Sequence, residues 1–505
     1  MYGFRPSSPM PAHLHRLLLP LALVAGVALT ALKGAGTSPT SPSPKPAVAV
    51  LSDWPAIDAE TLRHFQALVR LDTSPPVNEA AAVDYLKAAL DAEGIETKVF
   101  ALDPRRPNLV ARLRGNGARR PLLIMAHTDV VKVDPSKWKH PPFSATLEDG
   151  YIYGRGTIDD KDNVTVALMS LLLLKRSQLP LERDVVVLFE AGEETDTRVG
   201  IRYMVENHAA ELDAEFCIAE GGSIVRTEGR IQYGSVQLTE KIPNRVRLVA
   251  TGVAGHGSVP LRTNAVVYLA NAITKISEWQ TPMRLNDITR TFFERLATVS
   301  PPEDAARYRA LLQGDETGAV QEYLAVNKPQ LNSILRTSIS PTMLTAGVGS
   351  VNVIPSEASV VLDIRALPDE QVPQFMEQLA KVIDNPAIKI ERIGAENIRP
   401  GAPPSSRFND AFKAIESAIR REYGVITLPT MSTGATDMAF IRAMGIPCYG
   451  VGPIIDFEDA RKGYGAHSDQ ERISEEALYK FMRFKLDVVT ELAVAKAAPA
   501  PAAAP

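Results

Sequence analysis

Residues 184–195 read DVVVLFEAGEET, a short apolar run that is followed by three glutamates. The uninterrupted apolar residues 185–189 predict a strand buried on both faces, which is typical of a parallel sheet covered by helices. Carboxylates placed directly after such a strand lie at the edge of the sheet. In open α/β sheets, binding sites lie at the carboxyl ends of the strands. This stretch therefore predicts the fold class and the location of a site.

The same pattern continues around this stretch. Between about residues 54 and 240, short β-branched runs such as 108–113 and 122–126 alternate with helical periods such as the apolar segment 164–174. This alternation predicts an α/β domain with a mostly parallel sheet and helices on both faces. A helix at 81–90 and a strand at 215–219 are further predicted elements.

The pattern changes at about residue 241. Residues 241–396 contain the strand-like run RVRLVATGV, a helix beginning near Asn264, a polar excursion at 285–340, and a strand, helix and strand ending in IKIERI. These elements predict a small α+β domain inserted into the first domain. Alternating elements resume afterwards, so residues 397–492 are expected to complete the first domain.

Composition limits the kind of partner. The chain has 505 residues, of which 45% are hydrophobic and 23% charged, and this is ordinary for a folded protein of about two domains. A formal net charge of -4 provides no field that would collect nucleic acid or an anionic membrane. We therefore expect a small-molecule substrate and no nucleic-acid partner.

The two termini differ from the rest of the chain. Residues 1–36 combine basic residues with the apolar run 17–32, and a Ser/Pro/Thr-rich stretch follows at 37–53. This order predicts an export signal and linker, hence a periplasmic or secreted protein, with an uncleaved membrane anchor as the alternative. The Ala/Pro-rich residues 493–505 are expected to be a disordered tail.

The two cysteines, Cys217 and Cys448, are far apart in sequence and stand in strand-like contexts. We expect buried free thiols rather than a disulfide.

Polar clusters follow the predicted strands or lie in loops near them. Each alone is typical of a helix cap or a solvated loop. Together they place two imidazoles and several carboxylates at one sheet edge, a ligand set that suits zinc bound through nitrogen and oxygen. The clusters are HTD at 127–129, GRGTIDDKD at 154–162, EAGEET at 190–195, AEGG at 219–222 and GYGAHSDQE at 463–471.

Two local spacings suggest roles within this set. In an extended strand, His127 and Asp129 lie on the same side, so His127 can bind metal through one ring nitrogen while Asp129 accepts a hydrogen bond from the other. The adjacent Glu193 and Glu194 point in different directions, so one can bind metal while the other takes a proton from water.

These motifs resemble the dizinc metallopeptidases that include acetylornithine deacetylase, aminoacylase, succinyl-diaminopimelate desuccinylase, carnosinase and bacterial glutamate carboxypeptidase. The resemblance covers residues 54–490, with five signatures in the family's order. It implies a zinc-peptidase-like α/β domain with an inserted lid and dimerisation domain, and two zinc ions, with cobalt or manganese as alternatives. It further implies that His127 and Glu220 bind one ion, that Glu194 and His467 bind the other, that Asp159 bridges them, and that Glu193 is the general base.

Motifs of the inserted domain extend the resemblance. GVAGHGSVP resembles the family's lid signature and implies that His256 stabilises the oxyanion, in many relatives at the site of the other subunit, so that a homodimer is expected. Asn352, Arg365 and the TGATD residue Asp437 are the implied substrate-binding residues.

The long excursion at 285–340 resembles the carboxypeptidase-S and N-acyl amino acid hydrolase branch. Two positions depart from the family pattern: Asp162 replaces a small residue, and Ala439 stands where many relatives have a basic one.

The expected function is hydrolysis of amide bonds next to a free carboxylate, by an exported metallocarboxypeptidase or dipeptidase. An N-acyl amino acid amidohydrolase is the alternative, because both enzymes release the same carboxylated group. A periplasmic solute-binding protein is also exported, α/β and two-lobed, but it has no use for a base beside a metal ligand.

Overall fold

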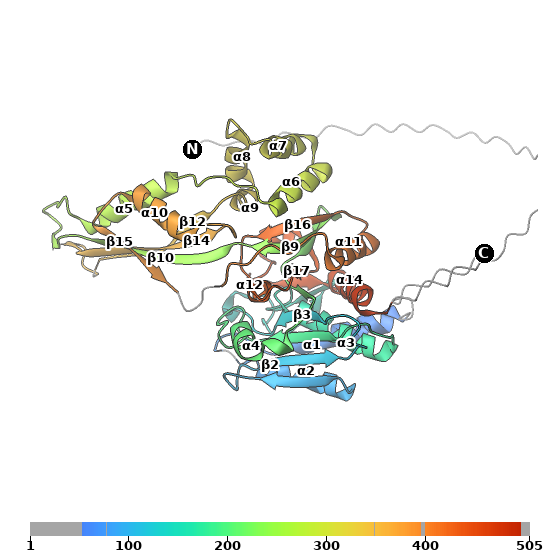
Figure 1. Ribbon diagram of the computed structural model, residues 1–505. Helices are drawn as coiled ribbons and strands as arrows, with labels where there is room; N and C mark the ends of the chain where they lie inside the picture. Colours follow the sequence, from blue (N-terminus) through green and yellow to red (C-terminus); the bar gives the residue numbers. More distant parts are fainter. Residues whose placement is uncertain (1–52, 77, 348, 395–398, 496–505) are drawn as a thin grey trace, which may run out of the picture. The chain divides into compact units, whose positions relative to one another are not determined.

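The computed structural model describes residues 53–76, 78–347, 349–394 and 399–495 (Figure 1). The predicted export signal, nearly all of the linker and most of the Ala/Pro-rich tail lie outside these residues. Among the helices of the described ranges, none is both long and apolar enough to cross a membrane.

A large sheet of ten strands forms the main layer, and its centre is parallel as predicted. Strands β6, β3, β7 and β17 are neighbours in that order, and each pairs in parallel with the next. Antiparallel strands flank this centre, β2 and β1 on one side and β9 on the other. The bounds of the ten strands are β1 Glu96–Phe100, β2 Asn108–Leu113, β3 Leu122–His127, β6 Val185–Glu190, β7 Phe216–Ala219, β8 Ser223–Thr227, β9 Arg230–Glu240, β16 Thr427–Ser432, β17 Cys448–Gly450 and β18 Ile454–Asp456.

Helices cover both faces of this sheet, and alternate residues of each strand serve the two faces. In β6, Val185, Val187 and Phe189 join a core formed mainly by five helices, whereas Val186 and Leu188 join a second core with two others. The five helices are α1 Trp54–Val69, α2 Ala80–Ala92, α3 Lys161–Ser177, α11 Asp410–Tyr423 and α14 Glu475–Ala493, and the two are α4 Ile201–His208 and α12 Met438–Ala443. The predicted α/β class is confirmed.

The cysteines lie within this sheet. Cys217 of β7 is directly opposite Cys448 of β17, and both are buried free thiols, as predicted.

A second, antiparallel sheet of four strands is built from residues 242–393 in the order β12, β14, β10, β15. Helices α5 and α10 pack on one face of it, where Leu269 and Leu379 join alternate residues of β10 and β14. Strand β12 is an edge, and most of its residues are exposed. The bounds are β10 Ile242–Thr251, α5 Ala265–Glu278, β12 Ser338–Ala346, β14 Glu357–Ala366, α10 Val372–Ile383 and β15 Ile388–Ile393.

The excursion at 285–340 contains four helices, and the first of them, α6, packs on the large sheet rather than on the small one. Phe292 and Phe293 of α6 form a core with Leu428 and Met431 of β16. A capping box at Asn286 begins α6. The helices are α6 Asp287–Val299, α7 Pro302–Leu312, α8 Ala319–Asn327 and α9 Pro329–Ser333.

Two smaller sheets complete the described part. One pairs β11 Gly255–His256 with β13 Val353–Ile354, and the other joins β19 Arg472–Ser474, β5 Tyr151–Tyr153 and β4 Thr146–Glu148. The short helix α13 spans Phe457–Arg461.

Candidate metal centre

The candidate site lies at the carboxyl ends of β6, β3 and β7. These strands are parallel neighbours, so the residues at and after their ends meet at one edge of the sheet. His127 is the last residue of β3, the EAGEET turn begins at the last residue of β6, and Glu220 directly follows β7. The apolar strands are therefore the reason that these distant polar residues converge.

Asp159 stands between the two predicted histidines. Its Oδ1 is 3.0 Å from Nε2 of His127, and its Oδ2 is 3.1 Å from Nε2 of His467. His467 Nε2 also lies 2.6 Å from Oε1 of Glu194, and His127 Nε2 lies 4.0 Å from Oε2 of Glu220. The five predicted ligands are thus brought together, with one carboxylate oxygen of Asp159 facing each imidazole.

The neighbouring Asp160 has a different environment. One of its oxygens accepts a hydrogen bond from the backbone nitrogen of His127 at 3.1 Å, and the other accepts one from Asn163 at 2.7 Å. Asp160 therefore faces the backbone of β3, whereas Asp159 faces the imidazoles.

The orientation of His127 is fixed through its second nitrogen. Nδ1 is 2.9 Å from the backbone carbonyl oxygen of Asp129 and donates to it, which leaves Nε2 available as a ligand atom. The Asp129 carboxylate is further away, at 3.5 Å from Nδ1. That carboxylate accepts hydrogen bonds from the Glu193 backbone nitrogen and the Thr195 hydroxyl, both at 3.1 Å. Asp129 therefore orients the imidazole with its main chain and the EAGEET turn with its side chain.

The two glutamates of this turn face different partners. Gly192 has φ +77°, and a Cβ there would lie 2.4 Å from the carbonyl oxygen of Asp196, so only glycine permits this tight turn. Beyond it, Glu194 contacts His467, whereas Glu193 contacts Arg399 at 2.8 Å. His467 itself has φ +63°, a left-handed backbone that is uncommon for a residue other than glycine.

The carboxylates crowded around His127 and His467 shift the pKa values of the site. Hydrogen bonds to Asp159 and Glu194 raise the pKa of His467 to about 10. Burial alone would lower the pKa of His127, but the carboxylates of Asp129 and Asp159 outweigh it and raise that pKa well above its usual range. Burial raises the pKa of Glu193 and of Glu220. The cluster therefore has more negative charge than its own cations balance, and a bound cation would relieve this imbalance.

The donor atoms fit metal ions in both number and spacing. Single ligand atoms of His127, Glu193 and Glu220 lie within 4.8 Å of one another, and so do those of His127, Asp159 and Glu194. Two atoms bound to one zinc at about 2.1 Å lie at most roughly 4.2 Å apart, so small side-chain movements suffice. Nitrogen and carboxylate donors without thiolates are suited to zinc and similar divalent ions.

Residues 123–491 match the family model described as peptidase family M20/M25/M40. The chain belongs to this peptidase family. It is therefore a hydrolase, and the predicted resemblance is confirmed.

Two relatives of this chain show the range of proteins to which its sequence is similar. The chain is 31% identical over 329 residues to a probable carboxypeptidase S-like 2 of Dictyostelium discoideum, covering 63% of this chain and 62% of that protein. It is 27% identical over 382 residues to the human N-fatty-acyl-amino acid synthase/hydrolase PM20D1, covering 73% and 74%. The chain therefore spans less than two thirds of the Dictyostelium protein.

The fold is also similar to that of a solved family member. The M20 family metallo-carboxypeptidase Sso-CP2 from Sulfolobus solfataricus has a TM-score of 0.63 at 22% identity, over 86% of this chain and 99% of that one.

Asp437, predicted to bind substrate, is buried in this M20 chain. Its Oδ1 lies 3.1 Å from Arg399, the same guanidinium that contacts Glu193. Arg399 was not predicted, because a single arginine in a Pro-rich segment gives no sequence signal.

The three predicted residues of the inserted domain lie in two places. The backbone carbonyl oxygen of Asn352 accepts a hydrogen bond from the backbone nitrogen of Gly257, so Asn352 lies beside His256. Arg365 pairs with Asp363 and is opposite Pro243, eight residues along β10 from Thr251. At about 3.3 Å per residue, this is roughly 26 Å of strand. Arg365 and the His256 region are therefore at opposite ends of the small sheet.

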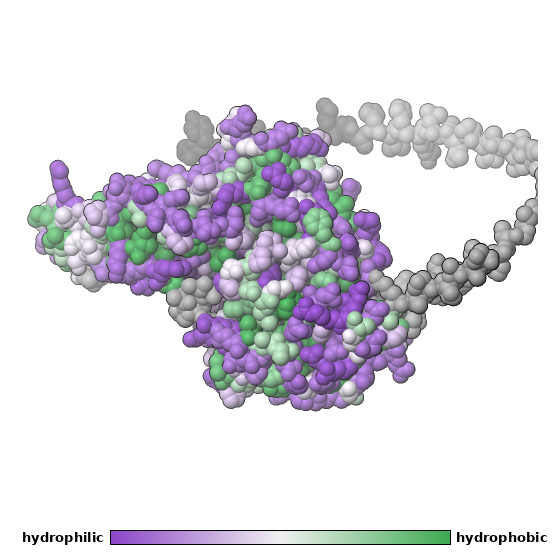
Figure 2. Space-filling view, viewed as in Figure 1, coloured by the Kyte–Doolittle hydropathy of each residue, from purple (hydrophilic) through white to green (hydrophobic). Residues whose placement is uncertain are grey.

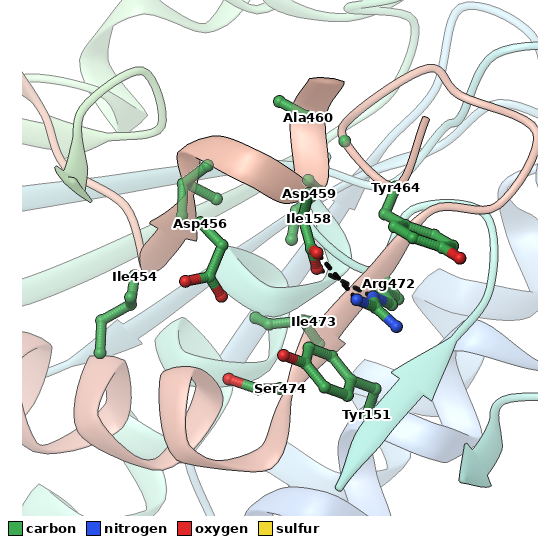
Figure 3. A pocket seen from close by; sticks show the side chains of 12 residues that line it. Tyr151, Ile158, Ile454, Asp456, Asp459, Ala460, Tyr464, Arg472, Ile473 and Ser474 are labelled. Carbon is green, nitrogen blue, oxygen red and sulfur yellow. Dashed lines mark hydrogen bonds and ion pairs between the residues drawn. The ribbon is translucent and has the colours of Figure 1, made fainter. Parts of the chain in front are cut away.

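The loop that contains His467 is fixed at its far end. Glu471 is fully buried and accepts hydrogen bonds from the backbone nitrogens of Gly156 at 3.2 Å and Ile158 at 2.9 Å, just before Asp159. Arg472 pairs with Asp459 and lies over the rings of Tyr151 and Tyr464 at 3.8 and 3.9 Å (Figure 3). These contacts join the two loops that contribute Asp159 and His467, and GYGAHSDQE was the sequence signal for the second.

Proposed function

We propose that this chain is an exported two-metal hydrolase that cleaves amide bonds next to a free carboxylate, as a carboxypeptidase or dipeptidase. The observation that carries the proposal is the position of Asp159, whose two oxygens face different imidazoles while Glu193 stands alongside. Membership of the peptidase family sets aside the solute-binding alternative.

The chain's own residues would perform distinct steps. When bound, two metal ions would supply Lewis-acid polarisation of the scissile carbonyl and acidify water. His127, Glu220, Glu194, His467 and the shared Asp159 are the proposed ligands. A carboxylate oxygen of Glu193 would accept a proton from the attacking water and then deliver it to the nitrogen of the leaving amine. Zinc is the proposed metal, with cobalt and manganese as alternatives.

The N-acyl amino acid amidohydrolase remains a second candidate, because the human relative is named for that chemistry. A panel of dipeptides and N-acyl amino acids, assayed with and without chelator, tests both. We expect chelator-sensitive hydrolysis of at least one class, with the higher kcat/KM identifying it. Equal turnover with and without chelator would contradict the metal-dependent mechanism.

Purified protein is expected to contain about two zinc-class ions per chain, because three carboxylates and two imidazoles exceed the ligands of one tetrahedral site. Elemental analysis after preparation in metal-free buffer measures this content. Full activity with one tightly bound ion per chain would contradict the two-metal centre.

A homodimer through the inserted domain is part of the proposal. Strand β12 is an edge strand that pairs only with β14 among the described residues, and its Met343 and Leu344 are 67% and 66% exposed. Val267 of α5 is also exposed. Figure 2 shows apolar surface among the hydrophilic residues of this part of the molecule. An exposed apolar sheet edge is a surface that a second copy can cover.

A further inference from the structure

One guanidinium connects the proposed base to a second loop of the site. Nη2 of Arg399 donates to the carboxylate of Glu193 at 2.8 Å and to the backbone carbonyl of the same residue at 3.1 Å. Its Nη1 lies 3.1 Å from Oδ1 of Asp437. The three side chains are only 12%, 9% and 2% exposed, respectively. These contacts are therefore shielded from water.

Burial makes this arginine necessary for the charge balance. Two carboxylates with little access to water repel each other, and each needs a cation or hydrogen-bond donors nearby. Within the described ranges, Arg399 is the only lysine or arginine that forms an ion pair with Glu193. Asp437 has no other ion-pair partner there either. Without Arg399, neither carboxylate would have a lysine or arginine partner among the described residues.

The geometry also restricts where the Glu193 carboxylate can lie. Arg399 binds both ends of the residue, the backbone carbonyl and the side-chain carboxylate, while the backbone nitrogen donates to Asp129 at 3.1 Å. A glutamate side chain otherwise rotates about three bonds. Proton transfer depends on distance, and a displacement of about 1 Å can lower a rate a hundredfold.

We propose that Arg399 is the positioning residue of Glu193, fixing the base relative to the candidate metal ligands and neutralising Asp437 behind it. The inference rests on the proposed function, in which Glu193 transfers the proton. Arginine suits this role because Nη2 of its planar guanidinium donates to two acceptors of Glu193 while Nη1 faces Asp437, an arrangement that a lysine ammonium cannot reproduce in the same geometry.

The test compares Arg399→Gln, Arg399→Lys and the matched control Arg442→Gln. Arg442 is even more buried, at 2% exposed against 12% for Arg399, and lines the same small cavity, but it pairs with Glu240 at 2.8 Å and not with Glu193. The kcat, KM and metal content of each variant are measured on the best substrate of the panel. We expect Arg399→Gln to lower kcat by about ten- to a hundredfold, with KM and metal content close to those of the wild type. Arg399→Lys should be intermediate, and Arg442→Gln should retain most of its kcat.

Removal of a buried cation can also impair folding. The double variant Arg399→Gln with Asp437→Asn restores the charge balance, so a folded protein with low kcat would support positioning. An unchanged kcat, a raised KM at normal kcat, or an equal kcat loss in Arg442→Gln would each overturn the positioning role. A wild-type protein that cleaves no substrate in the panel would overturn the proposed function, and the positioning role with it.

Discussion

Replacement of Glu193 by glutamine is expected to lower kcat by about a hundred- to ten-thousandfold while both metal ions remain bound. An amide has nearly the shape of a carboxylate but cannot accept the proton of the attacking water. Glu193 is close enough for this step, since one of its oxygens lies within 4.8 Å of ligand atoms of His127 and Glu220. Its contact with Arg399 does not involve the expected ligands, so the fold and the metal content should be preserved.

Glu194→Gln is the matched comparison, because it makes the same chemical change at the adjacent residue. Glu194 lies 2.6 Å from His467, one of the two imidazoles that face Asp159. Loss of its charge should weaken metal binding and lower activity through metal loss, which added metal would partly restore. Metal content and kcat are measured on the same samples. Equal loss of metal from both variants would show that Glu193 is a ligand rather than the base.

The central layer of the fold could be predicted because its signal is local. The apolar run at 185–189 and the run at 122–126 are buried on both faces, and a strand of that kind tolerates hardly any polar residue. Both became central parallel strands, β6 and β3. The residues that follow them therefore came together as expected.

Other elements depend on partners that are distant in sequence. Strand β9 has the mixed sequence RIQYGSVQLTE, and it pairs with β8, β16 and β17, two of which come from the C-terminal segment. No periodicity in that sequence identifies these neighbours. By contrast, α6 had a usable signal in the spacing of Ile288, Phe292 and Leu296 after Asn286, although the excursion as a whole reads as polar.

The candidate metal ligands that follow strands could be predicted from the sequence. The ion pairs of Arg399, which join several loops, were missed. His127 and Glu220 lie at the ends of apolar strands, so their convergence follows from the sheet. Arg399 meets Glu193 and Asp437 only because three separate segments fold together. The spacing of His127 and Asp129 correctly suggested that they interact, but the short hydrogen bond uses a backbone carbonyl, which sequence spacing cannot distinguish from a carboxylate.

Substitution of His256 by alanine is expected to lower kcat by about a hundredfold or more without changing the metal content. His256 is exposed, and its Nδ1 accepts a hydrogen bond from the backbone nitrogen of Ser258 at 3.2 Å. The ring proton of the neutral imidazole is therefore on Nε2, which makes that atom a hydrogen-bond donor. A donor directed at the oxyanion stabilises the transition state more than the substrate, so the loss should appear in kcat.

The position of His256 suggests which site it serves. It lies near the end of the small sheet that is remote from Arg365, about 26 Å of strand from the residues around Pro243. Strand β9 of the large sheet ends at Glu240 and β10 begins at Ile242, so the Pro243 end of the small sheet is the end that adjoins the large sheet of the same chain. If the small sheets of two copies meet, the far end of one copy can approach the site of the other. We therefore expect His256 to complete the site of the partner subunit in a homodimer.

Mixing His256→Ala chains with Glu193→Gln chains tests this arrangement directly. In a hybrid dimer, the first chain supplies an intact Glu193 and the second supplies an intact His256, so one complete site forms. Free exchange of equal amounts should restore about a quarter of wild-type activity, because half of the dimers are hybrids and each has one working site of two. Exchange is monitored with differently tagged chains. Exchange without recovery of activity would contradict the shared site, because a hybrid dimer would then contain both functional groups and still be inactive. A fully active His256→Ala protein would contradict the oxyanion role, because catalysis would then not need the imidazole.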